Sequence, residues 1–216
     1  SSFYLDVIKD RLYLEPRESK SRKGCQTVVS YIFENYNKVI APIVCHLAED
    51  AYQHSTLKTE DRPSVFTTGW FTMEDTWNNE TIRQHWDHII KFRTEAYKLI
   101  EQARTDKLFS TASESRIEVR VECSATKQAL DDLAPGEIEE VMIVSEVEQT
   151  NEVFECNEHE GKYVSQYTTP NGGTVHMRVS RARNHKCPRC WKHVAPAPGA
   201  LCKRCDDVVA NESFRL

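Results

Sequence analysis

Apolar residues recur every three or four positions through the first half of the chain, which is the spacing of an amphipathic helix. One helical segment is expected to end before Glu15-Pro16, because a residue that precedes proline disfavours the helical backbone. A longer apolar stripe runs over residues 25–52. Pro42 interrupts this stripe, and proline fits best in the first turn of a helix, so we expect a new helix to start there.

The next part of the chain is predicted to contain a loop and a fourth helix. An extended segment, pinned by its aromatic side chains, is expected at residues 65–70. Asn78 and Asn79 are good N-cap residues for a helix over residues 82–103, where the three-and-four spacing returns. Helices joined by short connections favour an antiparallel bundle, which we expect over residues 1–107.

The period of the pattern changes to two in the second half of the chain. Residues 117–123 alternate apolar with charged side chains, which is typical of a half-buried strand. A short helix is expected at 124–133 and a second strand at 141–147. An Asn-Gly-Gly turn inside residues 163–179 predicts a β-hairpin. Residues 108–180 are therefore expected to form a small mixed α+β subdomain.

The C-terminal region, residues 181–216, is too short to build a hydrophobic core of its own. It contains two Cys-x-x-Cys pairs, formed by Cys187, Cys190, Cys202 and Cys205. Four thiolates bind zinc tetrahedrally, and an apparent binding free energy of about 10–16 kcal/mol would order such a segment. We expect one Zn²⁺ here. The predicted fold class is mainly α with a small α+β unit, completed by a Cys₄ zinc knuckle or ribbon.

Two alternatives to zinc follow from the same cysteines. Two disulfides are one alternative, but the other four cysteines are scattered through predicted helices and strands, which favours a reduced compartment. A thioredoxin-like redox pair is the other, and it needs one motif in a strand–helix context, whereas this chain has two motifs.

Charge is distributed unevenly behind a formal net charge of −5. Residues 110–160 carry fourteen acidic and three basic side chains, whereas residues 178–205 carry eight basic and no acidic ones. Attraction to phosphate acts over about 8–10 Å, so the local excess matters more than the total. We expect the C-terminal end to bind a polyanion and the acidic middle to repel it, with a solvated surface of mixed charge as the alternative.

Ten side chains are candidates for nucleic-acid contact by charge and position. Basic groups would bind phosphates, and Trp191 would stack on an unpaired base, unless it packs over the zinc knuckle instead. The candidates are Arg22, Lys23, Arg181, Arg183, Lys186, Arg189, Trp191, Lys192, Lys203 and Arg204.

No catalytic residue is expected. The sequence has no Gly-rich phosphate loop, no Gly-x-Ser-x-Gly elbow and no paired acid and base. His85 with His88, and Cys156 with His159, have metal-like spacings but no third ligand nearby. No apolar run approaches the roughly 18 residues of a membrane helix. The first residues contain neither a start Met nor a signal peptide, so we expect a piece of a longer polypeptide.

Several stretches carry more specific motifs, namely residues 2–13 (SFYLDVIKDRLY), 22–28 (RKGCQTV), 41–50, and Val65-Phe66 with Gly69-Trp70. These stretches resemble the anticodon-binding region of isoleucyl-tRNA synthetase, a class I aminoacyl-tRNA synthetase of protein biosynthesis. Cys187-Pro-Arg-Cys-Trp191, with the later Cys pair, resembles the C-terminal zinc module of its bacterial and organellar forms.

The resemblance implies that the full protein is an ATP-dependent ligase that charges tRNA(Ile) with isoleucine. Its catalytic and editing domains, with ATP and Mg²⁺, would lie outside this chain, which would bind tRNA without catalysing the reaction. The implied partners are tRNA(Ile) and the missing domains of the same polypeptide, in a monomer without membrane contact. The short gap between the Cys pairs and the acidic middle are more similar to a mitochondrial enzyme. The expected location is therefore the mitochondrial matrix, with the bacterial cytoplasm as the alternative.

Two other functions compete with this interpretation. A free-standing, non-enzymatic helical and zinc module would bind nucleic acid or protein, and its native mass would be close to 25 kDa. A related synthetase for valine, leucine or methionine is the second. The Ser-Phe-Tyr opening and the terminal zinc module favour isoleucine.

Overall fold

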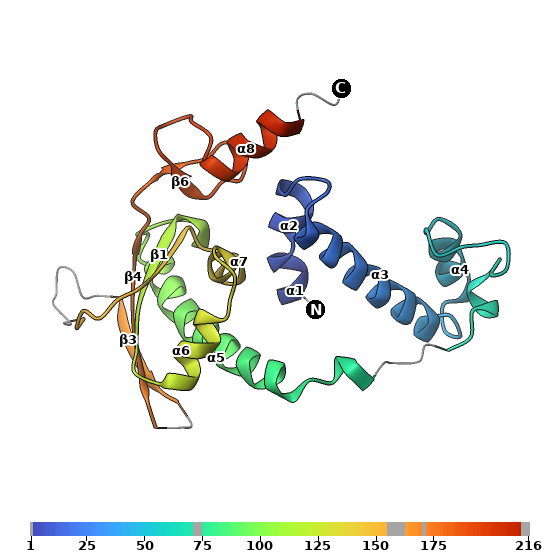
Figure 1. Cartoon of the computed structure of the whole chain (residues 1–216), viewed down its shortest axis with the longest axis horizontal. Helices are drawn as coiled ribbons and strands as arrows, with labels where there is room; N and C mark the ends of the chain where they lie inside the picture. The colour runs from blue at the N-terminus through green and yellow to red at the C-terminus, as the bar shows by residue number, and fades with distance from the viewer. Residues whose placement is uncertain (1, 71–74, 155–162, 170–171, 213–216) are drawn as a thin grey trace. The chain divides into compact units, whose positions relative to one another are not determined.

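A computed structural model describes residues 2–70, 75–154, 163–169 and 172–212. The chain forms two compact units (Figure 1). The first, called here the sheet unit, comprises Ser1–Leu14 and Asn79–Leu216; the second, the helical unit, comprises Glu15–Asn78. The predicted three-region division at residues 107 and 180 is a different partition and stays a prediction.

The helical unit contains helices α3 (Lys20–Ile40) and α4 (Cys45–Gln53). The break between them falls at Pro42, as expected, but the new helix does not start there. Instead the amides of Ile43 and Val44 both donate to the Ile40 carbonyl, and this turn delays α4 to Cys45. The expectation that proline would occupy the first helical turn was therefore wrong.

A 3₁₀ turn, η1 (Val65–Thr67), replaces the extended segment that the sequence predicted. The Ser64 hydroxyl accepts from the Phe66 amide at 3.3 Å, and such local side-chain bonds compete with extended structure. Aromatic side chains do not pin the segment, since Phe66 and Trp70 are 57% and 73% exposed. Val65 anchors it instead, packed with Ala41, Ala48 and Tyr52. A second turn, η2, spans Asp75–Trp77.

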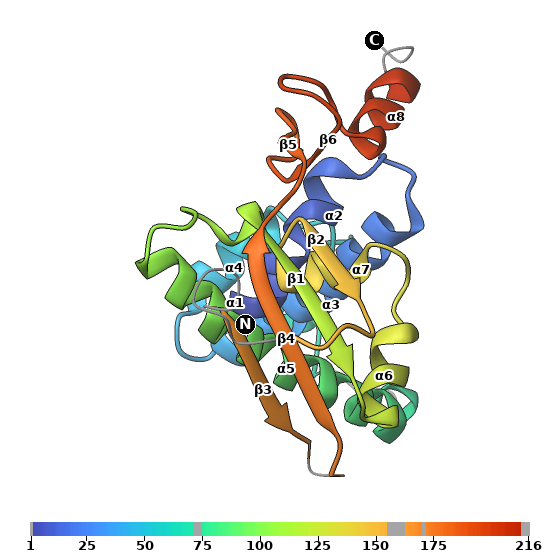
Figure 2. The same ribbon diagram turned by 90° about the vertical axis from the view of Figure 1, so that its left-hand side faces the viewer.

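The sheet unit is built on one four-stranded sheet, with strand order β2-β1-β4-β3 (Figure 2). Strand β1 runs parallel to β2 and antiparallel to β4, and β3 is antiparallel to β4. The strands are β1 (Ser115–Val121), β2 (Glu146–Gln149), β3 (Val164–Thr168) and β4 (Thr174–Arg181).

Helices pack against one face of this sheet (Figure 1). They are α1 (Ser2–Val7), α2 (Lys9–Leu14), α5 (Glu80–Thr105), α6 (Ser124–Asp131) and α7 (Glu137–Met142), with the 3₁₀ turn η3 (Ala112–Glu114) before β1. The C-terminal module consists of β5 (His185–Lys186), β6 (His193–Ala195) and α8 (Lys203–Glu212).

The main hydrophobic core lies between α5 and the sheet. Phe92, Ala96 and Ile100 of α5 pack in one cluster with Ile117 of β1 and Met177 of β4. Because this helix covers the sheet, the contacts group it with the α+β part of the chain. The coarse fold class is confirmed, since about half of the chain is helical and it contains a small mixed sheet and a Cys cluster.

Several predicted elements are confirmed. The N-terminal helical segment ends at Leu14, before Glu15-Pro16. The strand expected at 117–123 and the helix at 124–133 correspond to β1 and α6. Strands β3 and β4 form the predicted hairpin, although Asn171 of its turn lies outside the described residues.

The strand predicted at 141–147 was wrong in its first half. Helix α7 extends to Met142, and β2 begins only at Glu146. Three glutamates in the first turn of α7 favour a helix, because negative charge is stabilised at a helix N-terminus. Ile143 then ends it in the left-handed conformation, with φ of 56°. Among the described helices, none combines the length and apolarity that crossing a bilayer requires.

The predicted N-cap of α5 gives a first testable prediction. The Asn79 side chain accepts from the Ile82 amide at 3.1 Å. We expect Asn79→Ala to lower the free energy of unfolding by about 1 kcal/mol, because one amide of the first turn loses its partner. Urea denaturation measures the change. Asn78→Ala is the control, since the cap is formed by the next residue, and equal losses in both variants would contradict the assignment.

Candidate metal centre and nucleic-acid surface

Four cysteine sulfurs meet in the C-terminal module. Cys187 and Cys190 lie in the turn between β5 and β6, Cys202 directly precedes α8, and Cys205 is in its first turn. All four sulfurs lie within 4.8 Å of one another. The sequence expectation that the two pairs converge is therefore met.

The sulfur geometry fits a metal ion better than a disulfide. The Sγ atoms of Cys190 and Cys202 are 3.8 Å apart. A tetrahedral site with Zn–S bonds of about 2.3 Å implies sulfur separations of about 3.8 Å, whereas a disulfide bond is about 2.05 Å long. The donor set is compatible with zinc, and soft thiolates suit few other biological cations.

Burial and backbone donors act in opposite directions on these thiols. Burial alone would raise the pKa of Cys187, but the backbone N–H groups of Cys190 and Cys202 outweigh it and lower the pKa to about 6. Burial raises the pKa of Cys190 to about 12 and also raises that of Cys202. Gathering four thiolates here is unfavourable without a cation, which is the electrostatic signature of a metal site.

Trp191 closes the turn that carries the first Cys pair. Its amide donates to the Cys187 carbonyl at 2.9 Å, and its φ of 64° is left-handed. The indole is 67% exposed, with Lys186 Nζ 5.7 Å from the ring centre. It therefore presents an aromatic face beside a positive charge.

The basic candidates fall into groups with different surroundings. Lys23, Arg181, Arg183, Lys186 and Lys203 are exposed. Arg22 and Lys23 both lie in the first turn of α3, in the helical unit. Arg22 is half-buried, whereas Lys23 is exposed and pairs with Glu18 at 2.5 Å. Lys186 and Lys203 are the exposed candidates within the module, whereas Arg181, at the end of β4, donates through Nη2 to the Leu108 carbonyl at 2.5 Å.

Three other candidates point into the sheet unit. Arg189 Nη1 donates to the Leu14 carbonyl at 2.9 Å, and Lys192 Nζ donates to the Glu139 carbonyl at 3.2 Å. Arg204 Nη2 bonds Asp10 at 3.3 Å. These three side chains attach the module to the helices beneath it. Sequence reasoning missed their partners, which carry no local signal.

The acidic middle of the chain pairs with the basic tail. Arg178 Nε donates to Glu118 at 2.7 Å, and Arg183 Nη1 lies 3.6 Å from Glu148. Part of the negative charge of the middle is therefore neutralised by the tail, and the expectation that the middle repels a polyanion stays a prediction. The same pairing leaves the tail less basic than its composition suggests.

The histidine pair of α5 does not form a metal site. His85 pairs with Asp132 at 3.2 Å, and His88 Nδ1 lies 3.0 Å from the Thr126 hydroxyl. Cys156 and His159 lie outside the described residues.

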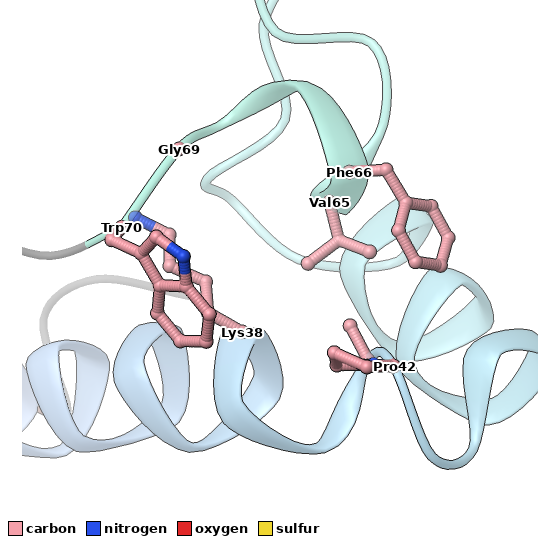
Figure 3. A pocket seen from close by; sticks show the side chains of 7 residues that line it. Lys38, Pro42, Val65, Phe66, Gly69 and Trp70 are labelled. Carbon is pink, nitrogen blue, oxygen red and sulfur yellow. The ribbon is translucent and has the colours of Figure 1, made fainter.

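A pocket of about 160 Å³ lies in the helical unit (Figure 3). Val65 and Pro42 lie between Trp70 on one side and Phe66 on the other. Its charged residue, Lys38, is already paired with Glu34 at 2.8 Å. The pocket therefore offers shape and aromatic surface rather than charge.

Residues 1–120 match the family model described as the anticodon-binding domain of tRNA ligase. The chain belongs to this family. The resemblance stated from the sequence motifs is thereby confirmed. The matched region covers α1 to α5 and most of β1, so it includes the helical unit and part of the sheet unit.

Relatives extend the similarity over nearly the whole chain. Isoleucine–tRNA ligase of Nostoc sp. strain PCC 7120 is 34% identical over 223 residues, which cover 98% of this chain and 22% of that protein. The Acaryochloris marina and Microcystis aeruginosa ligases are each 32% identical, covering 98% of the chain and 22% and 23% of those proteins. The chain thus spans about a fifth of the length of these relatives. All three are cyanobacterial, which gives no support to a mitochondrial origin.

Proposed function

We propose that the chain is the anticodon-recognising part of an isoleucine–tRNA ligase and binds tRNA(Ile). The match of residues 1–120 to the anticodon-binding domain carries this proposal, together with isoleucine ligases that align over 98% of the chain. Isoleucine activation with ATP and Mg²⁺, and editing, would take place in other domains of the same polypeptide. The chain alone would not catalyse aminoacylation, and the full protein would act as a monomer away from membranes.

The proposed metal is one zinc ion held by Cys187, Cys190, Cys202 and Cys205. The convergence of the four sulfurs supports it, as does the separation of 3.8 Å between two of them. The zinc would supply structural stabilisation rather than chemistry, because four protein ligands leave no open position for a substrate.

The proposed RNA surface is centred on the exposed side of the metal module. Lys186 and Lys203 would bind phosphates, and Trp191 would stack on an unpaired anticodon-loop base. Their exposure, and the cation beside the indole, support this role. Arg22, Lys23, Arg181 and Arg183 are proposed as further phosphate contacts. Arg189, Lys192 and Arg204 stay in the proposed set, but their contacts within the sheet unit compete with RNA.

Three finer expectations also remain proposals. The first is an antiparallel bundle of the helices in residues 1–107. The division at residues 107 and 180 would then mark the bundle, the α+β junction and the zinc module. The location also stays a proposal: the cyanobacterial relatives favour the bacterial cytoplasm over the mitochondrial matrix that the sequence predicted.

Charge reversal at Lys186 tests the RNA surface. We expect Lys186→Glu to weaken tRNA(Ile) binding by roughly tenfold at about 0.1 M salt, because a phosphate contact is replaced by repulsion. The measurement is a filter-binding or fluorescence titration with the full-length protein. Lys127→Glu, an exposed reversal on α6, is the control and should leave the affinity unchanged. Equal tRNA affinities of wild type and Lys186→Glu would show that the metal module is not part of the RNA-binding surface.

The same preparation separates the proposal from its alternatives. A native polypeptide of about 25 kDa would favour a free-standing module. Stronger binding and charging of a valine, leucine or methionine tRNA would assign the chain to a related ligase.

A further inference from the structure

Helix α2 lies between α7 and the C-terminal module within the sheet unit. On the α7 side, Arg11 bonds Glu137 at 2.7 Å and Glu140 at 2.8 Å. Burial lowers the pKa of Arg11, but these two carboxylates outweigh it, so the side chain stays charged. On the other side, α2 presents Asp10 and its C-terminal carbonyl at Leu14.

Three basic side chains of the module converge on this helix. Lys192 Nζ lies 3.4 Å and Arg204 Nη2 lies 3.3 Å from the same carboxylate oxygen of Asp10. Arg204 also reaches Glu140 of α7 at 3.6 Å, so it contacts both helices. Figure 2 shows the module in red directly beside the blue α2.

The contact continues to the cysteine cluster itself. Arg189 Nη1 donates to the Leu14 carbonyl, which is left without a helical partner at the end of α2, at 2.9 Å. The same nitrogen lies 3.6 Å from Cys205 Sγ, one of the four grouped sulfurs. The Leu14 side chain packs against the cluster of buried cysteines. Arg189, which contacts the candidate metal ligand Cys205, is therefore also hydrogen-bonded to the end of α2.

We propose that the metal-loaded cysteine module is a latch that holds the C-terminal half of α2 against α7. Asp10 and Leu14 are the latched groups, and Arg189, Lys192 and Arg204 are positioning residues. Besides the cysteines, the packed apolar side chains of the module are few, namely Val194, Ala195, Leu201 and Val208. Its shape therefore depends on the metal. Loss of the metal disperses the three basic groups and releases α2.

The latch gives three basic residues of the module an intramolecular role and joins the two ends of the chain. Arg204 and Asp10 are 194 residues apart in sequence. The helical unit begins at Glu15, directly after α2. Metal occupancy therefore controls how stably α2, the segment that leads into this unit, is held in place. The inference rests on the metal site of the proposed function and does not depend on RNA binding.

Hydrogen exchange of the full-length protein tests the latch. Peptides that cover residues 9–14 are followed by mass spectrometry in the zinc-loaded protein, after removal of zinc with a chelator, and after zinc is added back. We expect zinc removal to accelerate amide exchange in this helix by roughly tenfold or more, and zinc addition to restore it. Peptides within α5, which does not contact the module through these groups, should be unaffected.

A matched pair of variants separates the latch from the metal site. Asp10→Asn removes the charge that Lys192 and Arg204 contact; it should accelerate exchange in residues 9–14 while the zinc content stays at one per chain. Asp207→Asn, an exposed carboxylate of α8, should change neither. If zinc removal accelerates exchange in the module but not in α2, the latch is wrong and the metal site stands. If the protein binds no zinc, the latch and the metal site are both wrong. A failure to bind tRNA would contradict the proposed RNA surface but neither the latch nor the metal site.

Discussion

Cys202→Ser is expected to abolish stoichiometric zinc binding and to unfold residues 185–208, while α5 and the four-stranded sheet remain folded. A serine hydroxyl is a poor replacement for a thiolate ligand, and structural zinc contributes on the order of 10 kcal/mol to folding a small module. The sheet is stabilised by its own core between α5, β1 and β4, so it does not need the metal. Loss of the metal is therefore expected to unfold the C-terminal module but not the sheet and α5, although all of them belong to one compact unit.

Three measurements check this result. Metal analysis gives the zinc content, hydrogen exchange reports the order of residues 185–208, and near-ultraviolet circular dichroism reports the rest of the fold. Cys45→Ser is the control, because Cys45 is an exposed cysteine at the start of α4, remote in sequence from the module. A metal-free Cys202→Ser protein in which residues 185–208 remain protected from exchange would show that zinc does not stabilise the module.

The cysteine site was predictable because its information is local. Two Cys-x-x-Cys turns need only a short reversing loop to bring four sulfurs together, and thiolate chemistry then limits the ligand. Helix starts were predictable for the same reason, as the Asn79 cap shows. At Pro42 the break was local, but the position of the next helix depended on a turn that donates twice to Ile40.

Contacts between distant residues were not predictable. Lys192 was assigned to RNA by its charge, yet its partners are Asp10 and the Glu139 carbonyl. A one-dimensional charge count does not distinguish a basic group facing solvent from one facing an acidic helix. Likewise the strand at 141–147 was predicted from its apolar residues, while the glutamates before it favoured the helix that actually forms.

The charged face of β1 is a second case of contacts between distant residues that the sequence did not reveal, and here they affect the stability of the fold more strongly. The alternation in residues 117–123 predicted a half-buried strand, but Arg116 and Glu118 are each only 5% exposed. β1 is an inner strand, and Glu118 bonds Arg178 of β4 at 2.7 Å and Arg116 at 2.9 Å. Arg116 also bonds Glu148 of β2. Opposite charges on neighbouring strands therefore cover this face.

Replacing Glu118 should consequently be far more damaging than replacing an ordinary surface carboxylate. We expect Glu118→Ala to lower the free energy of unfolding by about 2–3 kcal/mol, because Arg116 loses one buried counter-charge and retains Glu146 and Glu148. Glu122→Ala is the matched control on the same sheet face: the Glu122 side chain is 41% exposed, against 7% for Glu118, and a loss below about 1 kcal/mol is expected. Urea denaturation at pH 7 measures both, and similar losses would contradict the buried network.

The pH dependence of the same variant gives an independent check. Burial raises the pKa of Glu118, but the hydrogen bond from Arg178 and the charge of Arg116 outweigh it and hold the pKa below its ordinary value. A carboxylate whose pKa is lower in the folded protein stabilises the fold above its unfolded pKa, and this contribution is lost as the pH falls through the folded pKa. The stability difference between wild type and Glu118→Ala should therefore be largest near neutral pH and shrink below about pH 4. A difference that stays constant down to pH 3 would mean that the glutamate acts through packing and not through its charge.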